Sequence, residues 1–359
     1  MNDTQNNRYT ELLRQLIATP RHSREETAAA DLMEDTLRQW GLSPKRLGNN
    51  LWLTDPQHDD RRPTLLLNAH IDTVKPVSSW TRNPYSPDIV GDRLYGLGSN
   101  DCGGGLLTLL ETFCRLTAPA AAGHRSWNLV YLASAEEEVS GRNGIEAVIG
   151  SGQLPAVSCA IVGEPTGLQP ATAEKGLMVI DGVAQGKSGH AARGEGINAI
   201  YEALDDLCFA RTYAFNKVSP LLGPTVMQVT IIGAGTQHNV VPDECRFTID
   251  VRTNELYTND EVLQLLQSHM KSRLTARSTR LASSRISDSH PLVRRCRQLG
   301  LVPFGSPTLS DQALMPWPSL KLGPGQSARS HSADEYICLS EMRQAVQLYA
   351  RLLTDEGHA

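Results

Sequence analysis

"NLVYLASAEEE" (residues 128–138) joins an apolar run directly to three consecutive glutamates. The run has no alternating polar face, which is typical of a strand that is covered on both sides. Strands of this kind belong to parallel sheets flanked by helices, so the stretch favours an α/β fold. The glutamates allow two interpretations, a solvated acidic turn or a site that performs chemistry. The other strands of the chain have to distinguish between them.

Two further apolar runs also lead into residues that can bind a metal. "TLLLNAH" (64–70) ends at His70, and "CAIVGEP" (159–165) contains Glu164. A third segment, "LYGLGSNDCGGGLLTLLETFCRL" (94–116), is a glycine-rich loop that carries an aspartate and opens into a helix. Ligands in open α/β sheets bind outside the carboxyl ends of the strands, so these side chains are expected at one edge. The expected cluster consists of His70, Asp101, Glu136, Glu137 and Glu164.

The pattern of apolar and polar residues changes between residues 174 and 285. Here "TVMQVTIIGAG" and "ECRFTIDVRT" alternate like strands with one exposed face, and helical patterns occupy 196–211 and 259–274. Such a mixture predicts a small α+β module. The segments before and after this region share the same pattern with each other. We therefore predict one catalytic domain, formed by 1–173 and 286–359, that is interrupted by an inserted module at 174–285.

Composition excludes several classes of partner. The 359 residues carry a net charge of −5 without a basic, aromatic-rich patch, which argues against nucleic acid. Seven scattered cysteines form no C-x-x-C pair, so neither a disulfide framework nor a cysteine metal site is expected. The polar start "MNDTQNNRYTELLRQL" and the lack of any long apolar run predict a soluble, cytoplasmic protein that does not enter membranes.

A histidine with an aspartate two residues later, His70 and Asp72, suits a metal ligand whose second ring nitrogen is held by a neighbour. Such a pair is more often structural when it stands alone, and it gains weight from its companions, which include His331 in "ARSHSADEY". Histidine and carboxylate without thiolate favour zinc, with cobalt or manganese as substitutes. Two histidines and three carboxylates are a usual set for two metal ions.

The order of the motifs resembles that of the M20 metallopeptidases and amidohydrolases. The matching motifs, spread from residue 68 to 336, are "NAHIDTV", the "GLGSND" loop, "SAEEEVSG", "VGEPT", "GKSGHAAR", "NVVPD", "DVR" and "GPG…SHSADEY". The resemblance implies a zinc-exopeptidase-like catalytic domain with a mixed, mostly parallel sheet. It also implies that the inserted α+β module is a ferredoxin-like dimerisation domain, and that the chain forms a homodimer through it.

The resemblance assigns ligands for two zinc ions. It implies that Asp101 bridges the ions, that His70 and Glu164 complete one site, and that Glu137 and His331 complete the other. A dinuclear centre of this type lowers the pKa of a shared water, whose hydroxide then attacks an amide carbonyl.

The remaining catalytic roles follow from the same resemblance. Glu136 is expected to be the general base, Asp72 to orient His70, and Glu138 to be either structural or a support for one of the ligands. The resemblance also implies a cis peptide between Asp101 and Cys102.

Residues near and within the inserted module are expected to bind substrate. His190 of "GKSGHAAR" matches a histidine that reaches the partner subunit's site and helps to hold the oxyanion. Asn239, Arg252 and Gly325 match positions that bind the substrate, the first two its α-carboxylate. Without the resemblance, Asn239 and Arg252 are equally compatible with a turn residue and an exposed strand charge.

The loop "GLGSNDCGGG" departs from the common family pattern G-R-G-x-x-D-M-K-G-G, because it lacks the arginine, the methionine and the lysine. With the compact length, this favours the acetylornithine-deacetylase branch. We expect a dizinc amidohydrolase that removes the acyl group of N-acetylornithine, or of N-acetylcitrulline or an N-acyl-lysine, in arginine or lysine biosynthesis. The alternatives are a desuccinylase of the succinyl-diaminopimelate type, a dipeptidase or carboxypeptidase, and a binding protein without turnover.

Overall fold

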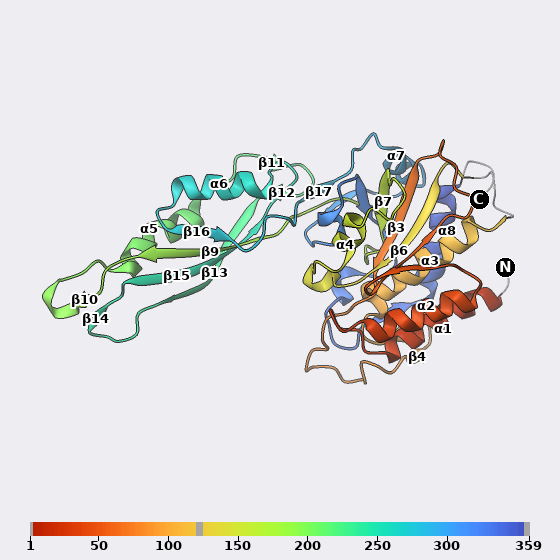
Figure 1. The fold of residues 1–359 in the computed structure, drawn as a ribbon, viewed down its shortest axis with the longest axis horizontal. Coiled ribbons are helices and arrows are strands. Elements are labelled where there is room, and N and C mark those ends of the chain that lie inside the picture. Colours follow the sequence, from red (N-terminus) through yellow and green to blue (C-terminus); the bar gives the residue numbers. More distant parts are fainter. Residues whose placement is uncertain (1–2, 120–124, 355–359) are drawn as a thin grey trace. The chain divides into compact units, whose positions relative to one another are not determined.

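The computed structural model describes residues 3–119 and 125–354, which form two compact units (Figure 1). Within the described residues, the first unit comprises the chain up to Thr172, Ile286–Phe304 and the chain from Ser310 onward. The second unit comprises Ala173–Arg285 and the short return Gly305–Leu309. The sequence pattern assigns this return to the catalytic domain, because five residues are too few to show a periodicity.

The first unit contributes most of a nine-stranded sheet with the order β1-β2-β6-β3-β7-β19-β8-β17, in which β18 also pairs with β8 and β17 belongs to the second unit. The four strands β6, β3, β7 and β19 run parallel at its centre. This arrangement confirms the predicted α/β class. The strands are β1 (Lys45–Leu47), β2 (Asn50–Thr54), β3 (Thr64–His70), β6 (Asn128–Ser134), β7 (Cys159–Val162), β8 (Ala171–Glu174), β17 (Ser284–Arg285), β18 (Phe304–Ser306) and β19 (Ser319–Lys321).

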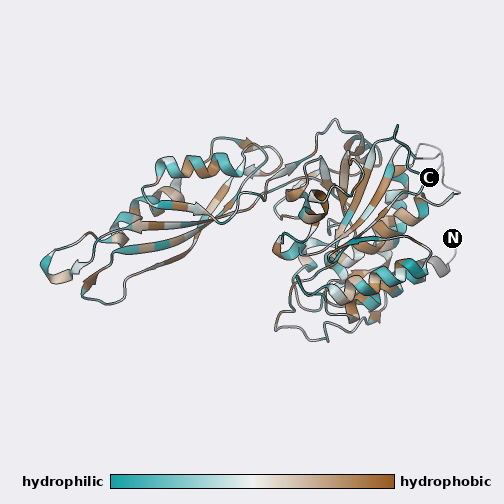
Figure 2. Ribbon diagram, in the orientation of Figure 1, coloured by the Kyte–Doolittle hydropathy of each residue, from teal (hydrophilic) through white to brown (hydrophobic). Residues whose placement is uncertain are grey.

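Both faces of the central strands are buried, as their continuous apolar sequences predict. Leu65 and Leu67 of β3 belong to one hydrophobic cluster, and Leu66 between them belongs to another. Successive side chains of a strand point to opposite faces, so the two clusters are the two sides of the sheet. The hydropathy colouring of the central strands shows the same apolar character (Figure 2). The helices of this unit are α1 (Asp3–Ala18), α2 (Thr27–Gln39), α3 (Gly104–Leu116), α4 (Ile145–Gly150), α7 (Pro291–Gln298) and α8 (Leu339–Leu353).

Helix α3 docks closely onto the end of β7. A Cβ atom on Gly105 would lie 1.7 Å from the carbonyl oxygen of Gly163, so only glycine allows this approach. Asp101 precedes α3, and Glu164 follows β7. The close packing of backbone on backbone therefore brings the loop that carries Asp101 beside the strand end that carries Glu164.

The first unit also contains a small sheet and several short turns. A three-stranded sheet has the order β20-β5-β4. Among the described residues, no helix is long and apolar enough to span a membrane. All seven cysteines are free. The elements are β4 (Ile89–Val90), β5 (Arg93–Tyr95), β20 (Tyr336–Cys338), the irregular helical turn η1 (Ser99–Gly103), and the 3-10 turns η3 (Glu137–Val139), η5 (Asp311–Leu314) and η6 (Ser327–Arg329).

The second unit is a four-stranded antiparallel sheet, β13-β15-β9-β16, with two helices. Its core contains Met178, Phe247, Ile249 and Val262 among other apolar side chains. This is the small α+β arrangement that the alternating strands predicted. The elements are β9 (Met178–Gln185), β13 (Val226–Ala234), β15 (Glu244–Arg252), β16 (Arg273–Ala276), α5 (Ala199–Thr212) and α6 (Asn259–His269), with the short pairs β10 (Gly189–His190) and β14 (Val240–Val241), β11 (Val218–Ser219) and β12 (Gly223–Pro224), and the turn η4 (Ala191–Arg193).

Candidate metal centre

His70 lies at the carboxyl end of β3, with 1% of its side chain exposed. Its Nδ1 is 2.9 Å from the backbone carbonyl oxygen of Asp72, so Nδ1 carries the proton and donates it. The carboxylate of Asp72 is 3.5 Å from the same nitrogen. Because Nδ1 carries the proton, the neutral ring has its lone pair on Nε2. Nε2 lies 3.2 Å from Asp101 Oδ1 and 3.6 Å from Glu164 Oε1. Asp72 thus orients the ring of His70 so that Nε2 faces the acidic cluster, and the predicted role of His70 as a metal ligand stays a prediction.

The loop before α3 holds Asp101 by its backbone. The carboxylate of Glu335 accepts hydrogen bonds from the N–H groups of Gly98, Asn100 and Asp101 at 3.0, 2.8 and 2.9 Å. Glu335 is buried, and burial raises its pKa to about 7. The peptide bond between Asp101 and Cys102 is cis, as predicted. Glu335 therefore fixes the position of Asp101, a role that the sequence analysis did not assign.

The acidic triplet is held by two buried carboxylates. Asp72 accepts the N–H groups of Glu137 and Glu138 at 3.1 and 3.2 Å, one on each oxygen. Glu26 accepts the N–H of Glu136 at 3.2 Å. The carboxylate of Glu136 accepts a hydrogen bond from the side-chain amide of Asn143 at 2.9 Å, so this side chain is turned into the following loop. Three adjacent glutamates thus have three different surroundings.

Glu138, rather than Glu137, joins the second histidine. Its Oε2 lies 2.9 Å from His331 Nε2, and its carboxylate lies close to His70 and Asp101, with one ligand atom of each within 4.8 Å of the others. Glu137 Oε2 is 4.0 Å from His70 Nε2. The placement is therefore one residue further along the triplet than the sequence analysis expected. The backbone of Glu136 is left-handed, with a φ of 56°, and no sequence pattern signals that turn.

The two oxygens of Asp101 face the two histidines. Oδ1 lies 3.2 Å from His70 Nε2, and Oδ2 lies 3.6 Å from His331 Nε2. His331 is about half exposed, with 54% of its side chain accessible, whereas His70 is buried. One carboxylate thus stands between a buried and an accessible position.

The cluster gathers several buried carboxyl groups, and one of their oxygen atoms has no hydrogen-bond partner among the described residues. Burial raises the pKa of Glu164 to about 8, and burial together with Glu164 raises that of Glu137 well above its usual range. Oε1 of Glu164 is buried and accepts no hydrogen bond from the described residues. Cys102 lies close to Glu164 as well, but its thiol donates to the carbonyl of Gly163 at 3.1 Å. An orphaned oxygen atom among buried carboxylates fits a divalent cation.

The remaining predicted residues fall into two places. Gly325 lies in the first unit with a φ of 85°, and a Cβ on it would lie 2.2 Å from Oδ1 of Asn100, the neighbour of Asp101. His190 and Asn239 lie at one end of the second unit, where the N–H of Ala191 donates to the carbonyl of Asn239 at 3.1 Å.

The side chains of these second-unit residues have local partners. His190 accepts a hydrogen bond from the N–H of Ala192 at 3.2 Å, and Arg252 forms an ion pair with Asp250 at 2.7 Å. Their predicted roles toward substrate stay predictions.

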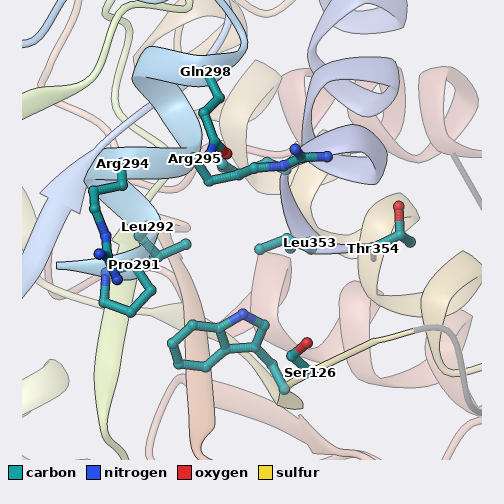
Figure 3. Close-up of a pocket in the computed structure, with 10 residues that line it drawn as sticks. Ser126, Pro291, Leu292, Arg294, Arg295, Gln298, Leu353 and Thr354 are labelled. Carbon is teal, nitrogen blue, oxygen red and sulfur yellow. The ribbon is translucent and has the colours of Figure 1, made fainter. Parts of the chain in front are cut away.

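A separate hollow of about 390 Å³ lies beside α7 and the end of α8 (Figure 3). Its lining includes Trp127, Arg294 and Arg295, and the indole of Trp127 stacks on His290 with ring centres 6.5 Å apart. None of the residues that line it belongs to the acidic cluster. The hollow is therefore separate from the acidic cluster at the strand ends.

The fold and the cluster define a metal-dependent hydrolase that acts on amides. The chain belongs to peptidase family M20/M25/M40, whose sequence model matches residues 66–355. Among its relatives is the acetylornithine deacetylase of Klebsiella pneumoniae (strain 342), which is 30% identical over 368 residues that cover 92% of each chain. The acetylornithine deacetylase of Pectobacterium carotovorum subsp. carotovorum (strain PC1) is 30% identical over 317 residues, with 80% of this chain and 79% of that protein covered.

Solved structures share the fold at lower identity. A tripeptidase from Staphylococcus aureus subsp. aureus Mu50 superimposes with a TM-score of 0.75 at 19% identity, covering 97% of both chains. The YXEP protein of Bacillus subtilis, a dinuclear metal-binding peptidase of the M20 family, has a TM-score of 0.74 at 16% identity and covers 98% of both chains. Family membership thus implies a divalent metal for the cluster described above.

The charged groups of the centre predict how the metal-free protein responds to pH. The pKa values of Glu164 and Glu335 are raised from 4.5 to about 8 and about 7 by burial, and that of His331 is raised from 6.5 to about 9 by Glu138. In each case the folded state binds more protons than the unfolded state at pH values between the ordinary and the raised pKa. Stability of the chelator-treated protein should therefore fall as pH rises from about 5 to about 9.

Urea unfolding at a series of pH values measures this dependence. Saturating divalent metal should weaken or reverse the decline, because the cation replaces the protons among the carboxylates. Stability of the metal-free protein that is constant or increases over this interval would contradict the assignment of these groups.

Proposed function

We propose that the chain is a dizinc amidohydrolase that removes the acyl group from an N-acylated amino acid, with N-acetylornithine as the first candidate. The observation that carries the proposal is Asp101, whose two oxygens face His70 and His331 as a bridging carboxylate requires. Glu164 beside His70 and Glu138 beside His331 complete a set of two histidines and three carboxylates. This set suits zinc, and cobalt or manganese are possible substitutes.

The contacts of the triplet favour a revised assignment of its roles. We infer that Glu138 is the ligand that shares a metal with His331, because it contacts that ring directly. Glu137 is then the general base, because its carboxylate faces the cluster at 4.0 Å from His70 Nε2, farther than Asp101 at 3.2 Å and Glu164 at 3.6 Å. Glu136 supports the turn through Asn143. The sequence predicts Glu136 as the base and Glu137 as the ligand. The revised assignment moves both roles one residue along the chain, to Glu137 and Glu138.

The catalytic cycle follows from these positions. A bound pair of divalent ions would lower the pKa of water and polarise the amide carbonyl. Glu137 takes the proton as the water attacks, and it delivers a proton to the departing amine. In the metal-free protein, burial and the neighbouring Glu164 raise the pKa of Glu137 and so favour its protonated form. Nearby cations would oppose that shift, which leaves a carboxylate able to accept a proton near neutral pH.

The substrate is proposed from the relatives, because two of them with the name acetylornithine deacetylase are each 30% identical. The alternative functions are removal of a succinyl group and hydrolysis of a short peptide, and the tripeptidase of similar fold keeps the latter open. A cytoplasmic location, in arginine or lysine biosynthesis, is part of the same proposal. The seven unpaired cysteines suit a reducing compartment.

A panel assay of the zinc-loaded protein tests this function. The substrates are N-acetylated and N-succinylated ornithine, citrulline and lysine, N-succinyl-diaminopimelate and a dipeptide, ranked by kcat/KM. We expect the acetylated basic or ureido amino acids to rank first, and chelator to abolish the activity. A higher kcat/KM for a succinylated compound or for the dipeptide would overturn the choice of substrate, and inactivity on the whole panel would overturn the proposed enzyme.

Substitution of each glutamate in turn tests the revised roles. Glu137→Gln should keep its metal content but lose at least about 10²-fold in kcat, because it loses a proton acceptor and no ligand. Glu138→Gln should instead lose metal from one site, and Glu136→Gln should keep both metal and most activity. Metal content is measured by elemental analysis after gel filtration. If Glu136→Gln loses activity while Glu137→Gln loses metal, the original order of roles is right.

We also propose a homodimer that forms through the second unit. Tyr201 and Leu204 of α5 are 68% and 47% exposed, and Ile231 and Ile232 of β13 are 61% and 56% exposed. Strand β13 is at the edge of its sheet, so its outer hydrogen-bonding groups are available to another strand. Pairing of two copies would cover both the edge and the apolar side chains. His190 of one subunit would then serve the site of the other, as the family resemblance implies.

Subunit complementation tests this arrangement. Glu137→Gln and His190→Ala are each expected to be inactive, and they are mixed under conditions that allow subunits to exchange. If His190 acts across the interface, each mixed dimer has one intact site, so random exchange should restore about one quarter of the parent activity. A mixture that stays inactive after proven exchange shows that His190 works within its own subunit or not at all.

A further inference from the structure

Arg21 is a fully buried arginine in the connection between α1 and α2. Only 2% of its surface is exposed, and its main-chain carbonyl accepts a hydrogen bond from the N–H of Thr73 at 2.9 Å. Thr73 in turn accepts the N–H of Ser23 at 3.2 Å, and the hydroxyl of Ser23 donates to the carboxylate of Asp72 at 2.7 Å. The connection therefore lies against the chain that leaves β3.

The guanidinium of Arg21 joins two segments that carry ligands. Nη1 donates to the carbonyl of Ile71 at 2.6 Å, and Nη2 donates to the carbonyl of Gly98 at 2.9 Å. Ile71 lies between His70 and Asp72, and Gly98 lies three residues before Asp101. A planar fork can hold two carbonyls at a fixed separation, whereas the ammonium of a lysine acts from a single point. The side chain thus spans the gap between the His70 strand end and the Asp101 loop.

The Asp101 loop is shaped to receive this side chain. Gly98 has a φ of 72°, and a Cβ on it would lie 2.6 Å from Nη2 of Arg21 and 2.4 Å from Cγ2 of Thr73. The positive charge of Arg21 is also matched, because Glu335 and Asp72 are the two carboxylates with the largest electrostatic effect on its guanidinium. These two carboxylates also hold the backbone of the Asp101 loop and of the acidic triplet. Burial lowers the pKa of Arg21 to about 10, so it stays charged at neutral pH.

We propose that Arg21 is a positioning residue of the metal centre, which sets the spacing between His70 and Asp101 through the carbonyls of Ile71 and Gly98. The inference rests on the proposed dinuclear function. Removal of the fork would free the loop to move relative to β3, and the ligands would then hold the metal less well. Groups that orient metal ligands typically change affinity by about 10 to 100-fold when they are substituted.

Titration with Co²⁺ tests the proposal, because its visible absorption reports the geometry and number of occupied sites independently of activity. The full-length parent, Arg21→Met and Arg21→Lys are compared after metal removal. Arg125→Met is the matched control, since Arg125 is 4% exposed and pairs with Asp55, which belongs to no ligand segment. It removes an equally buried guanidinium from the same unit.

We expect Arg21→Met to bind Co²⁺ at least about 10-fold more weakly than the parent, with an altered visible spectrum, and Arg21→Lys to be intermediate. Arg125→Met should lower the melting temperature but keep the parent's affinity and spectrum. Folded Arg21 variants that bind Co²⁺ like the parent overturn the proposal. Failure of Arg21→Lys to fold also overturns it, in favour of a purely structural role. A parent protein that binds no Co²⁺ overturns the proposed function itself.

Discussion

The carboxylate of Asp72 is the contact on which the candidate site depends. The two oxygens of this carboxylate accept hydrogen bonds from the N–H groups of Glu137 and Glu138, and the backbone carbonyl of Asp72 accepts one from Nδ1–H of His70. One residue therefore connects the ends of two parallel strands and sets the direction of three side chains. The hydroxyl of Ser23 donates to the same carboxylate, which adds the connection between α1 and α2 to the assembly.

The same principle is repeated around the cluster. Glu335 accepts three backbone N–H groups of the Asp101 loop, and Glu26 accepts the N–H of Glu136. Carboxylates that bind backbone N–H groups hold a loop rigidly, but each adds a buried negative charge. Positive charge has to offset this accumulation. Arg21 supplies part of it permanently, and the divalent ions that the family implies would supply the rest.

Much of the fold and site follows from the sequence alone. Apolar runs without alternation identified the central strands, because strands covered on both faces need apolar side chains at every position. The topology of an α/β sheet then places His70, Asp101 and Glu164 at one edge. The change to alternating strands after residue 173 similarly located the second unit. These features are determined locally, by the period of the side chains along each strand.

Tertiary structure decided what the local patterns leave open. Three adjacent glutamates are equivalent in sequence, and their directions differ because Glu136 adopts a left-handed turn and meets Asn143, while Asp72 holds the next two. Arg21 carries no motif, since its partners are backbone carbonyls 50 and 77 residues away. Sequence determined which residue types reach the edge of the sheet. Contacts between distant segments determined which of them face one another, because hydrogen bonds to the backbone depend on the path of the chain rather than on the identity of the residue.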